Sequence, residues 1–465
     1  MQERPRMRTV PPSLLALGLA LLAALLLLAL AVVEPQMALA VLPAAVALMV
    51  GLLFYEAPLL AVGLLVGVYG LAVDVQLDLM ADSGAAMLGS AVVKLVPFAI
   101  AAMFCLRYGV SSSINWPFLA FTVVAVVSVV VLPMGRVSSN GEMIRSFIGS
   151  TAPFVLAFAA APRRVWSSFC KGVVFVPLVS AAAGLLAWPV GLAQAFDINW
   201  RFQGMHSPPF LAGFCVTAVF AATLEYLRSA RMRWLLLGGC ALAILLATQA
   251  RAPLIAVFLF IAIVFLLADR RILPLKRKVD LVMGGMLPAA LLLGPVMIFA
   301  ADRLFGGGSD VNLSGRDVIW PYFVDAIDQR PLFGYGLGAG KLIVDPEDPR
   351  IRLIRSNAAH NEYLRLSVDA GIVGCTLIFT SLLAWVWAGT RRVAAADRLV
   401  MRAAILAALL HSAFDNTLIA ATAVVQFTWF TAALARARLE RHDGVPAGRL
   451  RASLAGAAAR PYPAE

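Results

Sequence analysis

The sequence predicts an all-α fold: a polytopic bundle of about 12–14 transmembrane helices with one long, partly helical loop late in the chain. Two observations predict this class. Of the 465 residues, 61% are hydrophobic and 14% are charged, and the mean hydropathy is +0.87. Soluble domains carry about 25% charged residues, so most of this chain is expected to lie in lipid. The apolar runs, such as 14–33 and 281–300, are also continuous rather than alternating as in barrel strands.

The individual spans are expected where long apolar runs are separated by polar residues. They are 13–33, 37–54, 57–73, 84–106, 116–134, 147–162, 171–191, 208–224, 234–249, 252–268, 280–300, 366–388, 399–413 and 417–436. The chain then divides into an N-terminal bundle (1–301), a loop that forms a cap (302–365), C-terminal membrane helices (366–436) and a tail expected to be disordered (437–465).

The loop charges predict the orientation of these spans. With the N-terminus in the cytoplasm, the inside loops are rich in cations: Arg163, Arg164, Lys171, Arg228, Arg231, Arg233, Arg270, Arg271, Lys276, Arg277, Lys278, Arg391, Arg392 and Arg398. The short opposite loops are poorer in Lys and Arg, as the positive-inside rule requires. The protein is expected in a bacterial inner membrane, with both termini on the cytoplasmic side and residues 302–365 on the periplasmic side.

The formal net charge of +12 does not indicate a nucleic-acid partner. The cations lie in short segments between apolar runs, where they orient helices, and no basic surface interleaved with aromatics is present. The cysteines lack metal-ligand or CxxC spacing and are interpreted as small buried residues: Cys105, Cys170, Cys215, Cys240 and Cys375. No metal site and no cofactor are predicted.

The long loop carries helix signals of its own. Ser314-Gly315-Arg316-Asp317 has the pattern of a capping box, with Ser314 as the N-cap and Asp317 at N3. Apolar residues then recur on one helical face from Val318 to Ile327, with Pro321 as a potential kink. Asn357 or a neighbour is expected to start the next helix. The loop is therefore predicted to be a small folded cap on the bundle.

His360 is the first candidate for chemistry. It lies in Asn357-Ala358-Ala359-His360-Asn361-Glu362, at the expected start of the helix that returns to the membrane. A helix N-terminus disfavours imidazolium, so the ring is expected to be neutral and able to act as a general base. A capping or interfacial histidine without catalytic part is the alternative, and position alone favours it.

Three outward arginines are candidates for binding an anion: Arg251, Arg316 and Arg201. Arg251 stands between two apolar spans on the side where few arginines are expected, so it needs an anionic partner or must snorkel. Arg316 lies near the start of the loop helix, where amides and guanidinium together suit phosphate oxygens. Snorkelling or ordinary solvation is the alternative for each.

For three further features, a structural interpretation is better than a functional one. The alternating glycines of 334–340 could let amides approach a ligand, but such a run is more often a flexible turn. The acidic segment 345–348 resembles a solvated turn more than a metal site, and Lys94 within a span is expected to point into the protein interior.

Several motifs together resemble those of the O-antigen ligase and O-antigen polymerase superfamily of bacterial membrane glycosyltransferases. They are Ser314-Gly315-Arg316-Asp317-Val318-Ile319-Trp320, Pro331-Leu332-Phe333-Gly334-Tyr335-Gly336-Leu337-Gly338, His360-Asn361-Glu362-Tyr363-Leu364, Gly371-Ile372-Val373-Gly374 and His411-Ser412-Ala413-Phe414-Asp415-Asn416. The resemblance covers about 190–435 and includes the hydropathy profile. The sequence departs from the family pattern in having Pro321 directly after Trp320, which leaves the exact loop geometry open.

The resemblance implies transfer of an undecaprenyl-diphosphate-linked glycan to a sugar hydroxyl with inversion and without a metal ion. The acceptor would be a glycan or a lipid-A-core-like molecule. Arg251 and Arg316 match the family arginines thought to hold the donor diphosphate, and Arg201 resembles an earlier periplasmic motif less closely. His360 matches the family histidine proposed to activate the acceptor hydroxyl.

Two questions about function remain open at this point: which acceptor is used, and whether the protein catalyses transfer at all. A ligase and a polymerase share this chemistry and differ in acceptor, and the sequence does not separate them. A polysaccharide or solute transporter, or a non-catalytic assembly partner, belongs to a different class. Transporters place ionisable residues at mid-membrane in paired halves, whereas this chain shows no internal repeat and few charges within its spans.

Overall fold

The computed structural model describes residues 57–73, 75–76, 83–132, 137–286, 315–345, 347–354 and 357–442. The expected spans 13–33 and 37–54, most of 280–300, and the tail beyond 442 lie outside these residues. In chain order the elements are α3 (Leu60–Gly70), α5 (Ser83–Tyr108), α6 (Trp116–Val130), α7 (Asn140–Thr151), η1 (Ala152–Phe158), α8 (Arg163–Gly172), η2 (Val173–Phe175), α9 (Val176–Ala187), α10 (Pro208–Ser229), α11 (Met232–Ala247), α12 (Arg251–Leu267), α13 (Leu275–Leu281), η3 (Val282–Met286), α15 (Arg316–Gln329), η4 (Ala339–Lys341), α16 (Pro349–Ile354), α17 (Glu362–Gly389), α18 (Ala395–Ser412) and α19 (Ala421–His442).

The predicted all-α membrane fold is confirmed. Among the residues that the structure describes, three helical stretches are long and apolar enough to cross a membrane: Arg163–Ala187, Pro208–Ser229 and Glu362–Gly389. Four shorter apolar helices accompany them within the described residues: α3, α6, α11 and α12. The expected span 171–191 begins earlier, at Arg163, because α8, η2 and α9 follow one another without a break.

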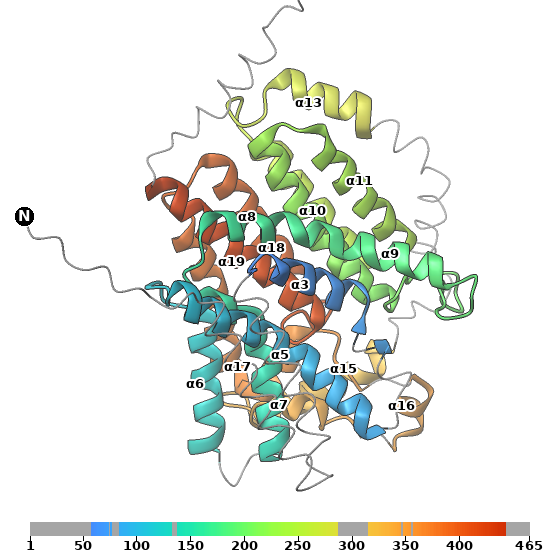
Figure 1. The fold of residues 1–465 in the computed structure, drawn as a ribbon. Helices are drawn as coiled ribbons and strands as arrows, with labels where there is room; N and C mark the ends of the chain where they lie inside the picture. The colour runs from blue at the N-terminus through green and yellow to red at the C-terminus, as the bar shows by residue number, and fades with distance from the viewer. Residues whose placement is uncertain are drawn as a thin grey trace, which may run out of the picture.

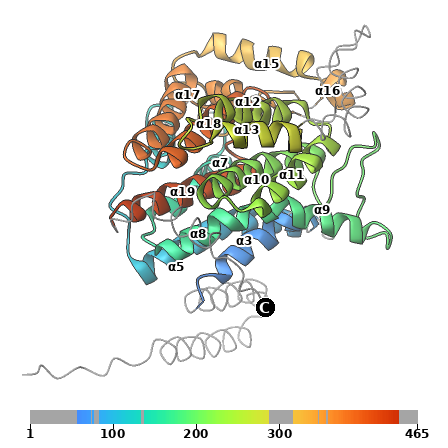
Figure 2. The same ribbon diagram turned by 90° about the horizontal axis from the view of Figure 1, so that it is seen from above.

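Helix α10 occupies the centre of the bundle. Figure 2 shows it beside α19, with α8 and α9 on one side and α17 and α18 on the other; α10 contacts α19, α9, α8 and α18 directly. Most residues of α10 are buried on every face, as expected for a helix that is apolar all round and enclosed by others. Figure 1 shows α15 and α16 in the part of the molecule farthest from α13.

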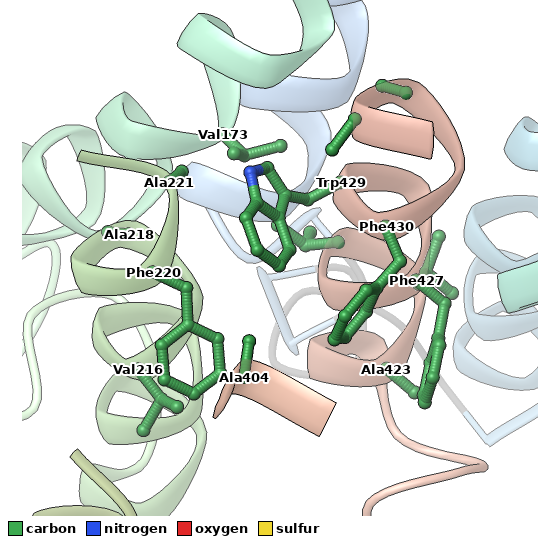
Figure 3. Packing of buried hydrophobic residues seen from close by; sticks show 14 of the residues in the cluster. Val173, Val216, Ala218, Phe220, Ala221, Ala404, Ala423, Phe427, Trp429 and Phe430 are labelled. Carbon is green, nitrogen blue, oxygen red and sulfur yellow. The ribbon is translucent and has the colours of Figure 1, made fainter. Parts of the chain in front are cut away.

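Aromatic side chains fill the contact between α10 and α19. Trp429 and Phe220 lie side by side with ring centroids 6.1 Å apart, and Trp429 packs on Phe430 at 4.9 Å (Figure 3). Such ring pairs add about 0.5–1.5 kcal/mol each to the burial of their surface. This packing fixes α19, and hence the segment before it, relative to α10.

Ion pairs join one end of the bundle. Arg228, at the C-terminus of α10, lies 2.6 Å from Asp397 at the start of α18 and also pairs with Glu440 of α19. Arg163, the first residue of α8, contacts Glu440 at 2.9 Å. These four residues define the Arg228 end. The loop charges predict that these four segment ends share one side of the membrane, and here they meet.

The candidate residues lie at the opposite end of the bundle, which we name the Asp415 end. Helix α18 starts at the Arg228 end with Asp397, so its last residue, Ser412, and the loop 413–420 lie at the opposite end. Helix α11 follows α10 after a short turn and packs along it, so it also runs toward the Asp415 end. Arg251, which opens α12 directly after α11, therefore lies at the same end as Asp415.

The start of the loop helix differs from the predicted capping box. Helix α15 begins at Arg316, and its N-cap is Gly315 with φ 76°, which a glycine adopts without strain. Asp317 is therefore at N2 rather than N3, and Ser314 lies outside the described residues. Pro321 is accommodated within a helix that continues to Gln329.

The glycine-rich segment is docked on α17. Gly371 interrupts α17 with φ 67° and ψ 179°, and Ile372 N–H donates to the Pro331 carbonyl (2.7 Å) instead of to its own helix. A Cβ on Gly371 would lie 2.1 Å from the Leu332 oxygen, and one on Gly334 would lie 2.3 Å from the Val368 oxygen. The two backbones approach so closely that only glycine fits, and the segment is held in place, contrary to a flexible turn.

Candidate functional site

Three segments far apart in sequence meet at the Asp415 end. Arg316 from α15 donates from Nη2 to the carbonyl oxygen of Phe414 at 2.7 Å. His360, directly before α17, places Nδ1 3.5 Å from Oδ1 of Asp415. The loop between α18 and α19 thus links the arginine and the histidine, which are 44 positions apart in the sequence.

Local structure fixes the position of His360. Asn361 is the N-cap of α17, and its side chain accepts from the N–H groups of Tyr363 and Leu364. The expected helix start near Asn357 is therefore four residues early. His360 itself has φ 46°, in the left-handed region, and Trp320 of α15 donates to the carbonyl of the preceding Ala359 at 2.8 Å. A non-glycine residue held at positive φ is strained and is kept there by its surroundings.

Asp415 is set between two histidines. Its Oδ1 faces His360, and its Oδ2 lies 3.9 Å from Nε2 of the buried His411. Burial by itself would raise the pKa of Asp415, but the bond from His360 and the two neighbouring imidazoles hold that pKa below its usual value. The carboxylate is therefore ionised at neutral pH. Partial burial lowers the pKa of Arg316, and Asp415 opposes that shift.

Several polar atoms around Asp415 have no hydrogen-bond partner within the described part of the chain. They are Nε of Arg316, Nε2 of His411 and Oδ1 of Asn416, all buried. The great majority of buried polar atoms in folded proteins are hydrogen-bonded, so a group of exceptions in one place requires an explanation. Because the His360 side chain is 39% exposed, the same place is also open to a ligand.

Arg251 and Arg201 lie together at the same end, at the junction of α11 and α12. Arg201 donates from Nε to the carbonyl of Thr248 at 3.0 Å. Gln249 turns the chain in the left-handed region with φ 53°, and Arg251 follows as the exposed first residue of α12. Helix α12 packs along α18. The structure therefore groups the four candidates as two pairs at one end: Arg316 with His360, and Arg201 with Arg251.

A buried ion triad supports the histidine, and sequence reasoning missed it. Arg365 places Nη1 2.7 Å from Asp369 and Nε 3.1 Å from Glu362, all on α17 and all buried. Asp369 also accepts from the N–H of Gly340 at 2.7 Å. Spacings of three and four residues in Glu362-x-x-Arg365-x-x-x-Asp369 were the available signal. The triad ties the glycine-rich segment to the helix that begins directly after His360.

The other residues singled out in the sequence lie outside the candidate site. Asp348 accepts from Tyr322 and from Arg350, so its turn is ion-paired within the loop. Lys94 is partly exposed, close enough to Lys341 to interact with it electrostatically. Of the cysteines, Cys240 is exposed and corrects the expectation of burial, and Cys105 is half-buried; the other three are buried as predicted.

Comparison with known protein families gives a match over the part of the chain that carries most of the candidate site residues. Residues 235–379 match the family model described as O-antigen ligase. The matched stretch runs from α11 to α17 and includes Arg251, Arg316 and His360, whereas Asp415 lies beyond it. No curated protein matches the chain. The match confirms the resemblance to the O-antigen ligase superfamily that the motifs indicate, and it suggests an enzyme of the glycosyltransferase type.

Proposed function

We propose that this O-antigen ligase-like membrane protein transfers a glycan from undecaprenyl diphosphate to a sugar hydroxyl on the periplasmic face of a bacterial inner membrane. One observation carries the proposal. Arg316, His360 and Asp415 come from three separate segments and meet beside buried polar atoms that have no partner within the described residues. A cation for a diphosphate and a base for a hydroxyl are the two groups that this reaction needs.

The proposed reaction uses these groups in a single displacement. The acceptor hydroxyl oxygen attacks the anomeric carbon of the donor sugar, and the bond from that carbon to the diphosphate oxygen breaks. His360 takes the hydroxyl proton as the new bond forms. The bonding electrons leave with undecaprenyl diphosphate, and because attack and departure occur on opposite faces, the anomeric configuration inverts.

The arginines are assigned to neutralise the charge of the leaving diphosphate. Nε of Arg316 has no hydrogen-bond partner within the described residues, so a phosphate oxygen placed there would gain a charge-assisted hydrogen bond. Arg251 opens α12, where the helix N-terminus adds to the positive potential. Arg201 is assigned a supporting part, because its Nε already holds the Thr248 carbonyl next to this junction. In this scheme guanidinium groups, rather than a metal ion, stabilise the growing charge.

Asp415 is assigned as the positioning residue of His360. A carboxylate next to Nδ1 favours the tautomer with the proton on that nitrogen, so Nε2 is the unprotonated nitrogen and is assigned to take the proton from the substrate. The separation of 3.5 Å is long for a hydrogen bond, and such contacts often tighten only when substrate is bound.

Glycan analysis of a deletion strain tests the activity and separates its two forms. Complementation with the wild-type gene is expected to restore surface glycan and to remove lipid-linked precursor. Without the protein, unattached long polymer on the lipid carrier indicates a ligase, and single repeats indicate a polymerase. Unchanged lipid-linked glycan in the deletion strain would contradict both and support a transporter or an assembly partner. A chelator added to purified protein is expected to leave transfer unchanged.

Asp415→Asn is expected to lower the turnover number by about 10–100-fold, the usual cost of losing the group that orients a functional histidine. The Michaelis constant for the donor is expected to change little, because Asp415 does not bind the diphosphate in this scheme. The measurement is steady-state transfer by the protein in nanodiscs, with Asp325→Asn, an exposed position on α15, as the control. A raised Michaelis constant at normal turnover would place Asp415 in donor binding instead.

A further inference from the structure

A cavity at the Arg228 end has no part in the proposed reaction. Its volume is about 370 Å³, within the range of about 300–1,000 Å³ typical of small-molecule pockets. Its walls come from the loop at 110–113, the segment 157–161 and the C-terminal half of α19, and Trp166 and Trp385 complete it. Val110 and Ala159 form a backbone bridge that joins the two loops of the rim.

The cavity contains a cation that no carboxylate among the described residues neutralises. Arg163, Arg228 and Arg436, which lie at the same end, each contact a carboxylate. Arg438, by contrast, lines the cavity and makes no hydrogen bond or ion pair with any part of the chain that the structure describes. Its guanidinium lies against Gly389, where a Cβ would come within 3.0 Å of Nη2. Glycine at the end of α17 therefore leaves space for the Arg438 guanidinium, whose charge no described residue neutralises.

Hydroxyl groups line the same cavity. Thr431 is 4% exposed, and its Oγ1 has no hydrogen-bond partner within the described residues. Ser111 and Ser113 contribute two more hydroxyls, 2.9 Å apart, at the rim. A guanidinium with several hydroxyl donors suits the oxygens of a phosphate group, and an unpaired buried hydroxyl marks where such an oxygen would be received.

We propose that this cavity binds the phosphate of an anionic phospholipid. Apart from Ser112, the rest of its wall is apolar, with Trp385, Leu434 and Leu439 placed to contact an acyl chain or the glycerol backbone. Basic pockets between membrane helices on the cytoplasmic side bind anionic head groups, and the loop charges place the Arg228 end on that side. The ligand would occupy the gap between the two rim loops and α19.

Lipid binding to the purified full-length protein tests this site. Native mass spectrometry is expected to show one retained phosphatidylglycerol and much weaker retention of phosphatidylcholine. Arg438→Gln is expected to weaken phosphatidylglycerol binding by about tenfold or more, because it removes a charge-assisted hydrogen bond. Thr431→Val, which keeps the side-chain shape, is expected to weaken it by about fivefold.

The control is Arg441→Gln, an exposed arginine one turn further along α19, which is expected to bind lipid as the wild type does. Equal retention of both lipids, or equal loss in Arg438→Gln and Arg441→Gln, would overturn the proposal. Thermal stabilisation by millimolar inorganic phosphate, lost in Arg438→Gln and not enhanced by phosphatidylglycerol, would identify a soluble phosphate ligand and overturn the lipid assignment. None of these measurements depends on glycan transfer.

Discussion

His360→Ala is expected to reduce glycan transfer by about 10²–10⁴-fold, the contribution typical of a general base. The side chain is 39% exposed and lies outside the hydrophobic core, so the variant should still insert and fold. The measurement is release of undecaprenyl diphosphate from lipid-linked glycan by purified protein in nanodiscs, at matched protein amounts. In cells the same variant should leave surface glycan absent and its precursor accumulated.

The control for His360 is Asn357→Ala, three residues earlier in the same segment. Asn357 is exposed and donates to the carbonyl of Lys341, so its loss tests the shape of the segment without touching the base. Transfer should remain close to the wild-type rate. Wild-type transfer by His360→Ala itself would remove this residue from the mechanism, and the Arg316 site would then need another base.

Arg316→Ala is expected to lower the turnover number by about 10²–10³-fold, as is usual when one donor to a developing negative charge is removed. Arg316 is half-buried, and its Nη2 also holds the Phe414 carbonyl, so Arg316→Lys separates charge from geometry. The lysine variant should recover part of the rate, because it retains the charge but not the planar fork. Single-turnover kinetics with saturating donor would measure the chemical step.

An exposed cation elsewhere provides the comparison for Arg316. Arg277→Ala in α13 changes the net charge equally and is expected to leave turnover unaltered. If Arg316→Ala raised only the Michaelis constant, Arg316 would bind donor and transition state equally. If Arg316→Ala and Arg277→Ala behaved alike, the diphosphate would have to bind elsewhere at the Asp415 end, with the junction at Arg251 as the next place to test.

The candidate residues were visible in the sequence, but their grouping was not. His360 and Arg316 stand out because each is an ionisable residue in an apolar chain, placed next to a helix start. Asp415 belongs to the motif His411-Ser412-Ala413-Phe414-Asp415-Asn416, but nothing in the sequence gives it a role, since it follows a span in a short loop and resembles a solvated carboxylate. Its part becomes apparent only when α18 and α19 place that loop beside α17, a contact that no local pattern specifies.

The glycine-rich segment shows how a sequence pattern can be misread for the same reason. Alternating glycines indicate either a flexible turn or an approach to a ligand, whereas the structure shows this segment docked on α17. Gly334 and Gly371 allow two backbones to touch, and the Arg365 triad then secures the contact. The requirement for glycine at Gly334 comes chiefly from the carbonyl oxygen of Val368, 34 positions away, so the local sequence does not reveal it.

The sequence by itself determined the helical membrane class, most of the described spans, which segment ends lie together at one end of the bundle, and the resemblance to the O-antigen ligase superfamily. Hydrophobic runs and charge asymmetry act within one span or loop, so they can be read along the chain. The tertiary structure alone decided the start of α15 at Gly315, the pairing of His360 with Asp415, and the grouping of Arg201 with Arg251. Each of these depends on side chains brought together by helix packing, and packing is a property of pairs of segments rather than of any one of them.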